Sequence, residues 1–262
     1  MTRRMKILIT AGPTREYLDP VRYLSNASTG KMGFAIAAAA AKRGHAVTLI
    51  AGPVDLPAPP NVRLVRVTSA MEMLAAARRA FATADAAVFA AAVSDWRPRK
   101  RSSRKLPKEL ISGKEPRASQ KEPRASQKEP RASARAATKT SENLVPVSAQ
   151  PDFSLDLVLN PDIAATLGRL KSRRSGPHRV TVGFALEDHD GRAKAAEKLR
   201  AKHFDAIVLN SPAAVATDRS TIQLLTADGC WMPARTASKS SHALQIVLLL
   251  ERLWSSSPAK RT

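Results

Sequence analysis

The fold is decided by residues 7–34, ILITAGPTREYLDPVRYLSNASTGKMGF. The apolar run from Ile7 to Ile9 predicts a short buried strand, and the turn residues at 11–14 end it. A long polar loop then leads to Gly33, where an apolar, alanine-rich helix begins. A buried strand, a glycine-containing loop and a helix N-terminus form an anion site, because backbone N–H groups and the helix dipole point at the ligand. We expect the rest of the chain to support such a site.

The remaining sequence alternates between strand and helix patterns. The expected strands are residues 6–10, 45–51, 62–67, 86–93, 180–185 and 206–210, and the expected helices are 33–43, 70–82, 160–171, 192–202 and 241–253. Ser69 and Glu72 can cap the second helix, and Asp228-Gly229 indicates a hairpin between 222–225 and 231–232. This order predicts an α/β fold with a doubly wound, mostly parallel sheet, helices on both faces and a small antiparallel hairpin near the C-terminus.

The overall composition limits the class of protein. The 262 residues fit one domain, 1–262, and the single cysteine, Cys230, excludes an intramolecular disulfide. No stretch approaches the roughly 18 apolar residues of a membrane span. Two arginines precede only a short apolar segment at the N-terminus, which does not indicate a signal peptide. We expect a protein of the reducing cytoplasm.

A basic repeat carries much of the net charge of +21. Residues 97–139 hold fifteen Lys or Arg and four Glu, a net of +11, and the heptad KEPRASQ occurs at 114–120 and 121–127 and, with one change, at 128–134. Proline in each heptad excludes a continuous helix, and side chains no larger than alanine offer little apolar burial. We expect 109–150 to be a disordered basic insertion within the domain. It is interpreted as a neutral loop expansion rather than a nucleic-acid tether, because it lacks aromatic residues that stack on bases.

Two common nucleotide motifs are absent. Gly30-Lys31 lacks the earlier glycine of a P-loop, and Met32 stands where a P-loop has Ser or Thr. No G-x-G-x-x-G follows the first strand, so a dinucleotide site is not indicated. The five histidines show no metal-ligand spacing.

Polar side chains are expected to converge at the carboxyl ends of the strands, the usual ligand crevice of such sheets. These are Thr14, Arg15, Asn26, Ser94, Asp95, Trp96, Lys105, Lys108, the helix start at Asn160-Pro161-Asp162, Gly183-Phe184, Lys198 and Lys202. Lysines and backbone amides suit a nucleoside triphosphate and a second anionic substrate. Structural alternatives remain open: Asp95 as a loop cap, Asn26 as a turn residue, Phe184 as core, and Lys198 with Lys202 as a solvated helix face.

Several segments together resemble one family, the phosphopantothenate–cysteine ligases. They are AGPTREYLDPVRYLSNASTGKMGFAIA, AAVSDWRP, NPDI, VGFALE, KLRAK and DRSTIQLL. The resemblance implies a Rossmann-like fold, a homodimer, CTP as co-substrate with Mg2+, and no flavin. It implies that 4′-phosphopantothenate reacts with CTP to give an acyl-cytidylate and pyrophosphate. L-Cysteine then displaces CMP to form 4′-phosphopantothenoylcysteine in coenzyme A biosynthesis, and a separate decarboxylase acts next.

The resemblance also implies roles for individual residues. Asn26 serves the second half-reaction, and Lys105 is the essential lysine of a flap over the site. Pro107 replaces a flap lysine, which leaves Lys108 and Lys114 as alternatives to Lys105. The nucleotide contacts implied are Ala90, Ala91, Asp95, Lys105, Asn160, Pro161, Asp162, Ile163, Phe184, Lys198 and Lys202. The metal ligands, and the choice between CTP and ATP, stay open, with CTP favoured.

Two other functions are compatible with parts of the sequence. One is a catalytically inactive ligase fold that binds nucleic acid or another polyanion through the basic repeat. The other is a sugar-nucleotide reductase of related fold, which the missing G-x-G-x-x-G disfavours.

Overall fold

The computed structural model describes residues 4–106, 154–172, 179–214 and 217–256. The expected insertion at 109–150 lies outside these ranges, as do the alternative flap lysines Lys108 and Lys114. Within these ranges, no helix combines the length and the apolar character needed to cross a membrane.

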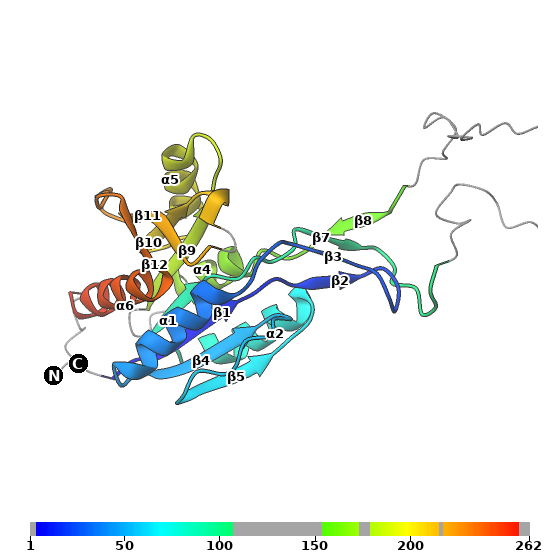
Figure 1. Ribbon diagram of the computed structural model, residues 1–262, viewed down its shortest axis with the longest axis horizontal. Coiled ribbons are helices and arrows are strands. Elements are labelled where there is room, and N and C mark those ends of the chain that lie inside the picture. Colours follow the sequence, from blue (N-terminus) through cyan, green and yellow to red (C-terminus); the bar gives the residue numbers. More distant parts are fainter. Residues whose placement is uncertain (1–3, 107–153, 173–178, 215–216, 257–262) are drawn as a thin grey trace, which may run out of the picture.

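An eight-stranded sheet forms the body of the molecule, in the order β12-β11-β10-β9-β6-β1-β4-β5 (Figure 1). Six strands are parallel: β1 (Lys6–Ala11), β4 (Ala46–Ala51), β5 (Val62–Arg66), β6 (Ala86–Phe89), β9 (Val180–Leu186) and β10 (Ala206–Asn210). Two antiparallel strands, β11 (Arg219–Thr226) and β12 (Arg235–Ser238), complete one edge. The predicted mostly parallel, doubly wound sheet of Rossmann-like type is confirmed, and β5 forms its other edge.

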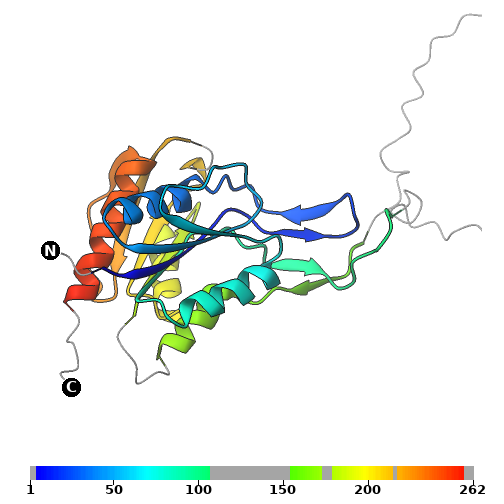
Figure 2. The same cartoon turned by 90° about the horizontal axis from the view of Figure 1, so that it is seen from below.

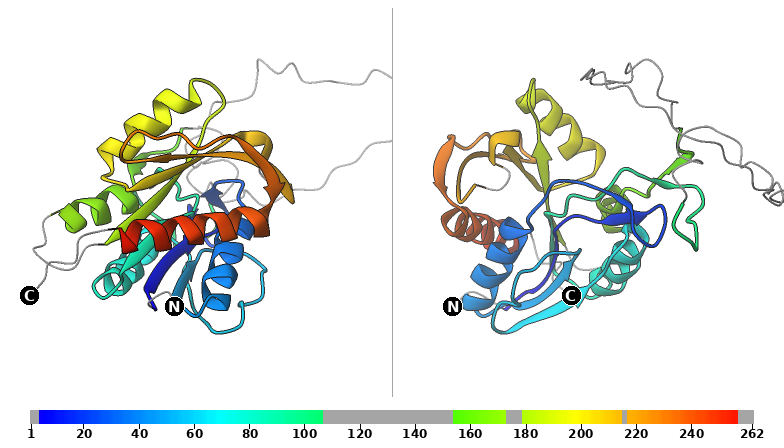
Figure 3. Two further views of the ribbon diagram at one scale, coloured as in Figure 1. Left: turned by 90° about the vertical axis from the view of Figure 1, so that its left-hand side faces the viewer. Right: turned by 45° about the vertical axis from the view of Figure 1, so that its right-hand side comes forward.

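Helices cover both faces of this sheet, as predicted. One face packs against α1 (Lys31–Lys42) and α6 (Lys239–Ser255), and the other against α2 (Ala70–Phe81), α4 (Ile163–Ser172) and α5 (Gly191–Ala201) (Figure 3). A short 3-10 helix, η2 (Pro212–Ala214), follows β10. Alternation along β1 explains the two cores, because Ile7 and Ile9 point to the α1 side and Leu8 to the α2 side. A strand buried on both faces has no polar alternation, which is why this segment is an unbroken apolar run.

Two β-ribbons extend away from the body and were not predicted (Figures 1 and 2). One pairs β2 (Arg15–Tyr17) with β3 (Tyr23–Ser25), and the other pairs β7 (Trp96–Pro98) with β8 (Leu157–Leu159). We call the two ribbons together the arm. The interpretation of the segment before Gly33 as one polar loop is wrong, because this segment contains β2 and β3. The two strands were missed because each has only three residues, too few for an alternating pattern to be recognised.

Several element ends differ from the prediction. The strand expected at 86–93 ends at Phe89, because the chain leaves the sheet and Ala92 only bridges to Pro13, which has no N–H to donate. The helix expected from Gly33 begins at Lys31, since Gly30 at φ 72° is its N-cap. The hairpin turns at Gly229 (φ 85°), but the partner of β11 is β12, and Trp231 forms only one bridge, to Leu225.

The capping prediction for α2 is confirmed in one half. Ser69 Oγ accepts a hydrogen bond from the backbone N–H of Glu72 at 3.3 Å. The Glu72 carboxylate reaches back to the N–H of Thr68 at 2.9 Å, one residue before the N-cap. Both contacts satisfy backbone donors at the helix start.

Candidate active site

The first turn of α1 stands directly on the end of β1. Gly12 and Gly30 both have positive φ angles, 75° and 72°, which an L side chain rarely adopts. A Cβ on Gly33 would lie 2.4 Å from the Cβ of Ala11, so only glycine permits this approach of helix to strand. The first turn holds no acidic residue, and Gly30 supplies no side-chain cap. Backbone N–H groups at this end of α1 are therefore suited to an anionic ligand.

Asn26 joins the loop after β3 to the loop after β6. Its Nδ2 donates to the carbonyl oxygens of Ala92 and Val93 at 3.3 and 3.0 Å, while the side chain stays exposed. Nearby, Thr14 Oγ1 accepts from the N–H of Ser94 at 3.0 Å. The turn interpretation of Asn26 is incomplete, because its partners lie 66 and 67 residues away in the chain.

Asn160 continues this line of contacts. Its backbone N–H donates to the Asp95 carbonyl at 2.7 Å, and its Nδ2 donates to the Ser94 carbonyl at 2.9 Å. Its Oδ1 accepts from Arg97 Nη1 at 3.1 Å. The exposed carboxylate of Asp95 has no hydrogen bond or ion pair with the described part of the chain, so it is not the loop cap considered from sequence. Ala90 and Ala91, half-buried, begin the same loop.

Asp162 caps α4 and pairs with Lys202, the residue that follows α5. Its Oδ1 accepts from the N–H of Ala165 at 2.9 Å, and its Oδ2 lies 2.9 Å from Lys202 Nζ. Burial raises the pKa of the Asp162 carboxyl, but the Ala165 N–H and the Lys202 ammonium outweigh this and lower it. The neighbouring Ile163 is buried in the core, and Pro161 is half-buried.

Lys198 also has a carboxylate partner, because its Nζ forms an ion pair with Glu187. Lys198 and Lys202 are therefore not simply a solvated helix face, since each pairs with an acidic residue. Phe184 is half-buried and packs on the core, which supports its structural interpretation. The preceding Gly183 pairs with Phe89 across β9 and β6, so the chain positions after the two strands are adjacent.

Two lysines lie beside the start of α1, and the sequence analysis named neither of them as a site residue. Lys31 Nζ is 2.8 Å from Asp218 Oδ1, and Lys239 opens α6 close by. Burial and the Lys31 charge lower the pKa of Lys239, and Asp218 raises it less. Lys239 was missed because 208 positions of sequence separate it from Lys31. The only feature of the sequence that could have indicated Lys239 is its position at the start of α6, directly after the N-cap Ser238.

Lys105 is not brought together with these residues. Its side chain is exposed. The segment after β7 runs to the far end of the arm (Figure 2), where Leu106 bonds to the turn between β2 and β3. Most of the other candidate residues in the described ranges lie in the loops after β1, β3, β6 and β8, on β9, or on α5 and directly after it, while Arg15 and Trp96 belong to the arm. The structure thus assembles one group of candidate residues and leaves Lys105 apart.

A carboxylate-rich metal site is not present in the described ranges, where no three His, Cys, Asp or Glu side chains come together. Cys230 is exposed and free. A cation at this site would therefore depend on oxygens that its ligand brings.

Comparison with known proteins identifies relatives over most of the chain. Residues 2–116 and 132–253 match the family described as the C-terminal domain of the DNA/pantothenate metabolism flavoprotein, and the gap between them falls inside the basic repeat. The coenzyme A biosynthesis bifunctional protein CoaBC of Escherichia coli K12 is 36% identical over 231 residues, 87% of this chain and 47% of the relative. CoaBC of Haemophilus influenzae is 37% identical over 228 residues, 86% of this chain and 46% of the relative.

Solved structures agree with these matches. The crystal structure of the C-terminal domain of CoaBC has a TM-score of 0.69 and 28% identity, and the match covers 97% of both chains. A Cab2 variant in complex with phosphopantothenate-cysteine has a TM-score of 0.64 at 15% identity, covering 96% of this chain and 88% of the other, and it shows likeness of fold. This chain spans about half the length of the curated relatives it matches. It belongs to the family of the C-terminal domain of the DNA/pantothenate metabolism flavoprotein.

Proposed function

We propose that this chain is a phosphopantothenate–cysteine ligase of coenzyme A biosynthesis, working in the cytoplasm. The observation that carries the proposal is a continuous line of contacts across the strand ends. It runs from Asn26 to the carbonyls of Ala92 and Val93, and from Ser94 and Asp95 to Asn160. The pair of Asp162 and Lys202 follows directly. The names of the CoaBC relatives, which cover the chain at 36–37% identity, support the same activity.

The first half-reaction activates a carboxylate. A carboxylate oxygen of 4′-phosphopantothenate attacks the α-phosphorus of CTP, forming a C–O–P anhydride and releasing pyrophosphate. The N-termini of α1 and α4 and the cations Lys31, Lys198 and Lys202 suit the negative charge of the triphosphate. Asp95, Asn160 and Phe184 are assigned to contacts with the nucleotide, as the family resemblance implies.

The second half-reaction transfers the acyl group. The amine of L-cysteine attacks the anhydride carbon, an amide bond forms, and CMP leaves with the C–O bond electrons. Asn26 is assigned here, since its exposed amide is held against the 92–93 loop at the mouth of the site. The product, 4′-phosphopantothenoylcysteine, would then be the substrate of a decarboxylation.

Mg2+ fits this site as a companion of the nucleotide. The described carboxylates form no three-residue cluster, whereas Mg2+ commonly keeps its waters and binds substrate phosphates with one or two carboxylates. Asp95, whose carboxylate is unpaired in the described ranges, is the candidate protein ligand. When bound, the ion would neutralise phosphate charge, and the lysines would orient the same oxygens.

A homodimer is part of the proposal, and the arm is its contact surface. Four large apolar side chains of the arm are exposed: Val21 at 59%, Tyr23 at 41%, Trp96 at 49% and Leu159 at 64%. Trp96 and Leu159 are direct cross-strand partners of β7 and β8, so they form one apolar patch. Exposed apolar patches on a projecting element favour contact with another chain. A second copy is the partner that would also bring Lys105 of one arm to the strand ends of the other subunit.

Pyrophosphate release tests the function. With 4′-phosphopantothenate and L-cysteine, we expect turnover with CTP well above turnover with ATP. No pyrophosphate release with either nucleotide would overturn the proposal.

The alternative function, polyanion binding through the basic repeat, is tested by deleting residues 114–134. Ligase activity that survives the deletion supports the enzyme. Salt-sensitive nucleic-acid binding lost on deletion, together with no ligase activity in the full chain, would favour the alternative.

A further inference from the structure

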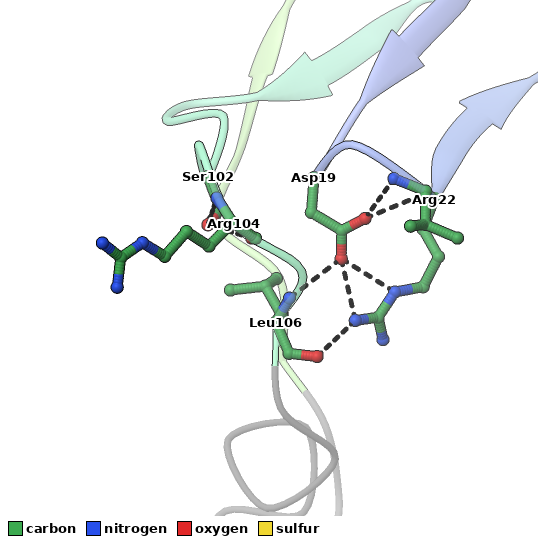
Figure 4. Close-up of polar contacts among 6 residues, drawn as sticks. Asp19, Arg22, Ser102, Arg104 and Leu106 are labelled. Atoms are coloured by element: carbon green, nitrogen blue, oxygen red, sulfur yellow. Dashed lines mark hydrogen bonds and ion pairs between the residues drawn. The ribbon is translucent and has the colours of Figure 1, made fainter.

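Asp19 is a buried carboxylate in the turn between β2 and β3 (Figure 4). Its side chain has no exposed surface. Oδ1 accepts hydrogen bonds from the backbone N–H groups of Val21 and Arg22, both at 2.8 Å. Oδ2 accepts from Arg22 Nε at 2.9 Å and from the N–H of Leu106 at 3.1 Å. One carboxylate therefore holds its own turn with one oxygen and a distant segment with the other.

Two more contacts attach that segment to the turn. Arg22 Nη2 donates to the carbonyl of Leu106 at 2.5 Å, and the N–H of Ser102 donates to the carbonyl of Leu18 at 2.8 Å. Between these points, Ser102 Oγ bonds to the N–H and the carbonyl of Arg104 at 3.2 and 2.6 Å. Residues 102–106 are thus fixed at both ends. Lys105 lies inside this span with its side chain exposed.

The chemistry of the position requires an anion. Burial raises the pKa of Asp19, but the N–H groups of Val21, Arg22 and Leu106 and the charge of Arg22 outweigh it and lower the pKa to about 2. An asparagine could keep an oxygen for Val21 and Arg22, and its NH2 would then face the donors of Arg22 and Leu106. Replacement by asparagine should therefore release the 102–106 segment while leaving the turn itself largely intact.

We propose that Asp19 is a positioning residue of the ligase reaction. By bonding the turn between β2 and β3 to Leu106, it fixes the position of Lys105 on the arm. In the proposed homodimer, this is the position from which Lys105 acts on the nucleotide phosphates at the strand ends of the other subunit. The inference rests on the proposed function, and it concerns the support of a lysine rather than contact of Asp19 with substrate.

The bond between Asp19 and the 102–106 segment can be tested without an enzyme assay. In Asp19→Asn, amide hydrogen exchange should speed up at Leu106 and Ser102 and change little in β1 and β6. Asp156→Asn is the matched control, because it breaks another aspartate–arginine pair of the arm, to Arg99, at which both side chains are exposed. The control should leave the Leu106 exchange rate unchanged. Equal protection of Leu106 in Asp19→Asn and the native chain would overturn the anchor.

A double-mutant cycle tests the action through Lys105. In the pyrophosphate assay we expect Asp19→Asn to lower the rate of the first half-reaction about ten-fold or more, with the KM for L-cysteine unchanged, because small misplacements of a reacting group are costly. Lys105→Ala alone should lower the same rate more than Asp19→Asn does. Combining both changes should cost no more than Lys105→Ala alone, since a lysine that is absent cannot be misplaced.

Each result has a distinct meaning. A loss from Asp19→Asn that persists fully in the Lys105→Ala background, or the absence of any effect of Lys105→Ala, would overturn the positioning role while native turnover still supports the ligase. No turnover of the native chain would overturn the ligase and with it the positioning role. The exchange measurement would then still decide whether Asp19 anchors the segment.

Discussion

Lys202 Nζ lies 2.9 Å from Asp162 Oδ2, and this contact joins the start of α4 to the end of α5 beside the strand ends. Asp162 already caps α4 through Ala165, so the lysine is the member of the pair that can turn to a ligand. A triphosphate would compete with Asp162 for the same ammonium group.

Lys202→Ala tests this exchange of partners. We expect the KM for CTP to rise at least ten-fold with little change in the free energy of unfolding, because a partly exposed pair contributes about 1 kcal/mol or less. Initial-rate kinetics and urea unfolding measure the two effects. Arg200→Ala, an exposed cation on the same helix, is the control and should change neither quantity. A normal KM for CTP in Lys202→Ala would remove this lysine from the site.

Asn26→Asp should separate the two half-reactions. The acyl-nucleotide should still form, and its transfer to L-cysteine should slow by about a hundred-fold or more, as for loss of one oriented polar group at a reaction centre. Aspartate also loses the Nδ2 donor to Ala92 and Val93, and its charge faces their carbonyls. Asn26→Ala, which loses the donor without adding charge, shows how much of the effect comes from the loop. Chromatography of the intermediate after quenching measures both steps, and normal overall turnover would contradict the assignment.

Gly33→Ala should distort the contact between α1 and β1. The added Cβ would meet the Cβ of Ala11 at 2.4 Å, and overpacking of this kind costs roughly 1–3 kcal/mol. Gly44→Ala is the comparison, because its Cβ would meet nothing within 4 Å and only the φ of 87° opposes it. Urea unfolding should show both losses, and only Gly33→Ala should also weaken nucleotide binding.

The acid stability of the arm should depend on Asp19. Its pKa in the folded chain, about 2, lies below the usual 3.8, so its stabilisation is fully present above pH 4 and is lost as the pH falls towards 2. Unfolding of the native chain and of Asp19→Asn should therefore differ most near neutral pH, and the difference should shrink between pH 4 and 2. A constant difference over this range would show that the carboxylate charge is not what stabilises the turn.

Trp96→Glu should weaken the proposed homodimer. The charge would fall in the apolar patch that Trp96 forms with Leu159, and sedimentation velocity should show a shift towards monomer. Leu248→Glu on α6 replaces an apolar residue of similar exposure outside the arm and should leave the sedimentation coefficient unchanged. A native sedimentation profile in Trp96→Glu would place the contact elsewhere.

Sequence patterns predicted the body of the molecule and missed the arm. The strand at 6–10 and the helices on both faces follow from long apolar patterns, which tertiary packing reinforces. The ribbons have three-residue strands, and β7 and β8 lie on either side of a segment of more than fifty residues, so no local pattern pairs Trp96 with Leu159. The sequence placed Asn26 and the end of the strand expected at 86–93 at the same edge of the sheet, but it did not predict a contact between them. Their direct hydrogen bonds depend on a chain reversal that the sequence does not reveal.

The pairing of β7 with β8 also determines how the chain can change over generations. Pro98 faces Leu157, and the N–H of Arg99 donates to the carbonyl of Asp156 at 2.9 Å, so the two ends of the intervening sequence leave the ribbon side by side. Heptads can therefore be gained or lost between them without shifting either strand or any residue at the sheet ends. Related chains with different numbers of KEPRASQ copies should keep the same ribbon and the same catalytic rates.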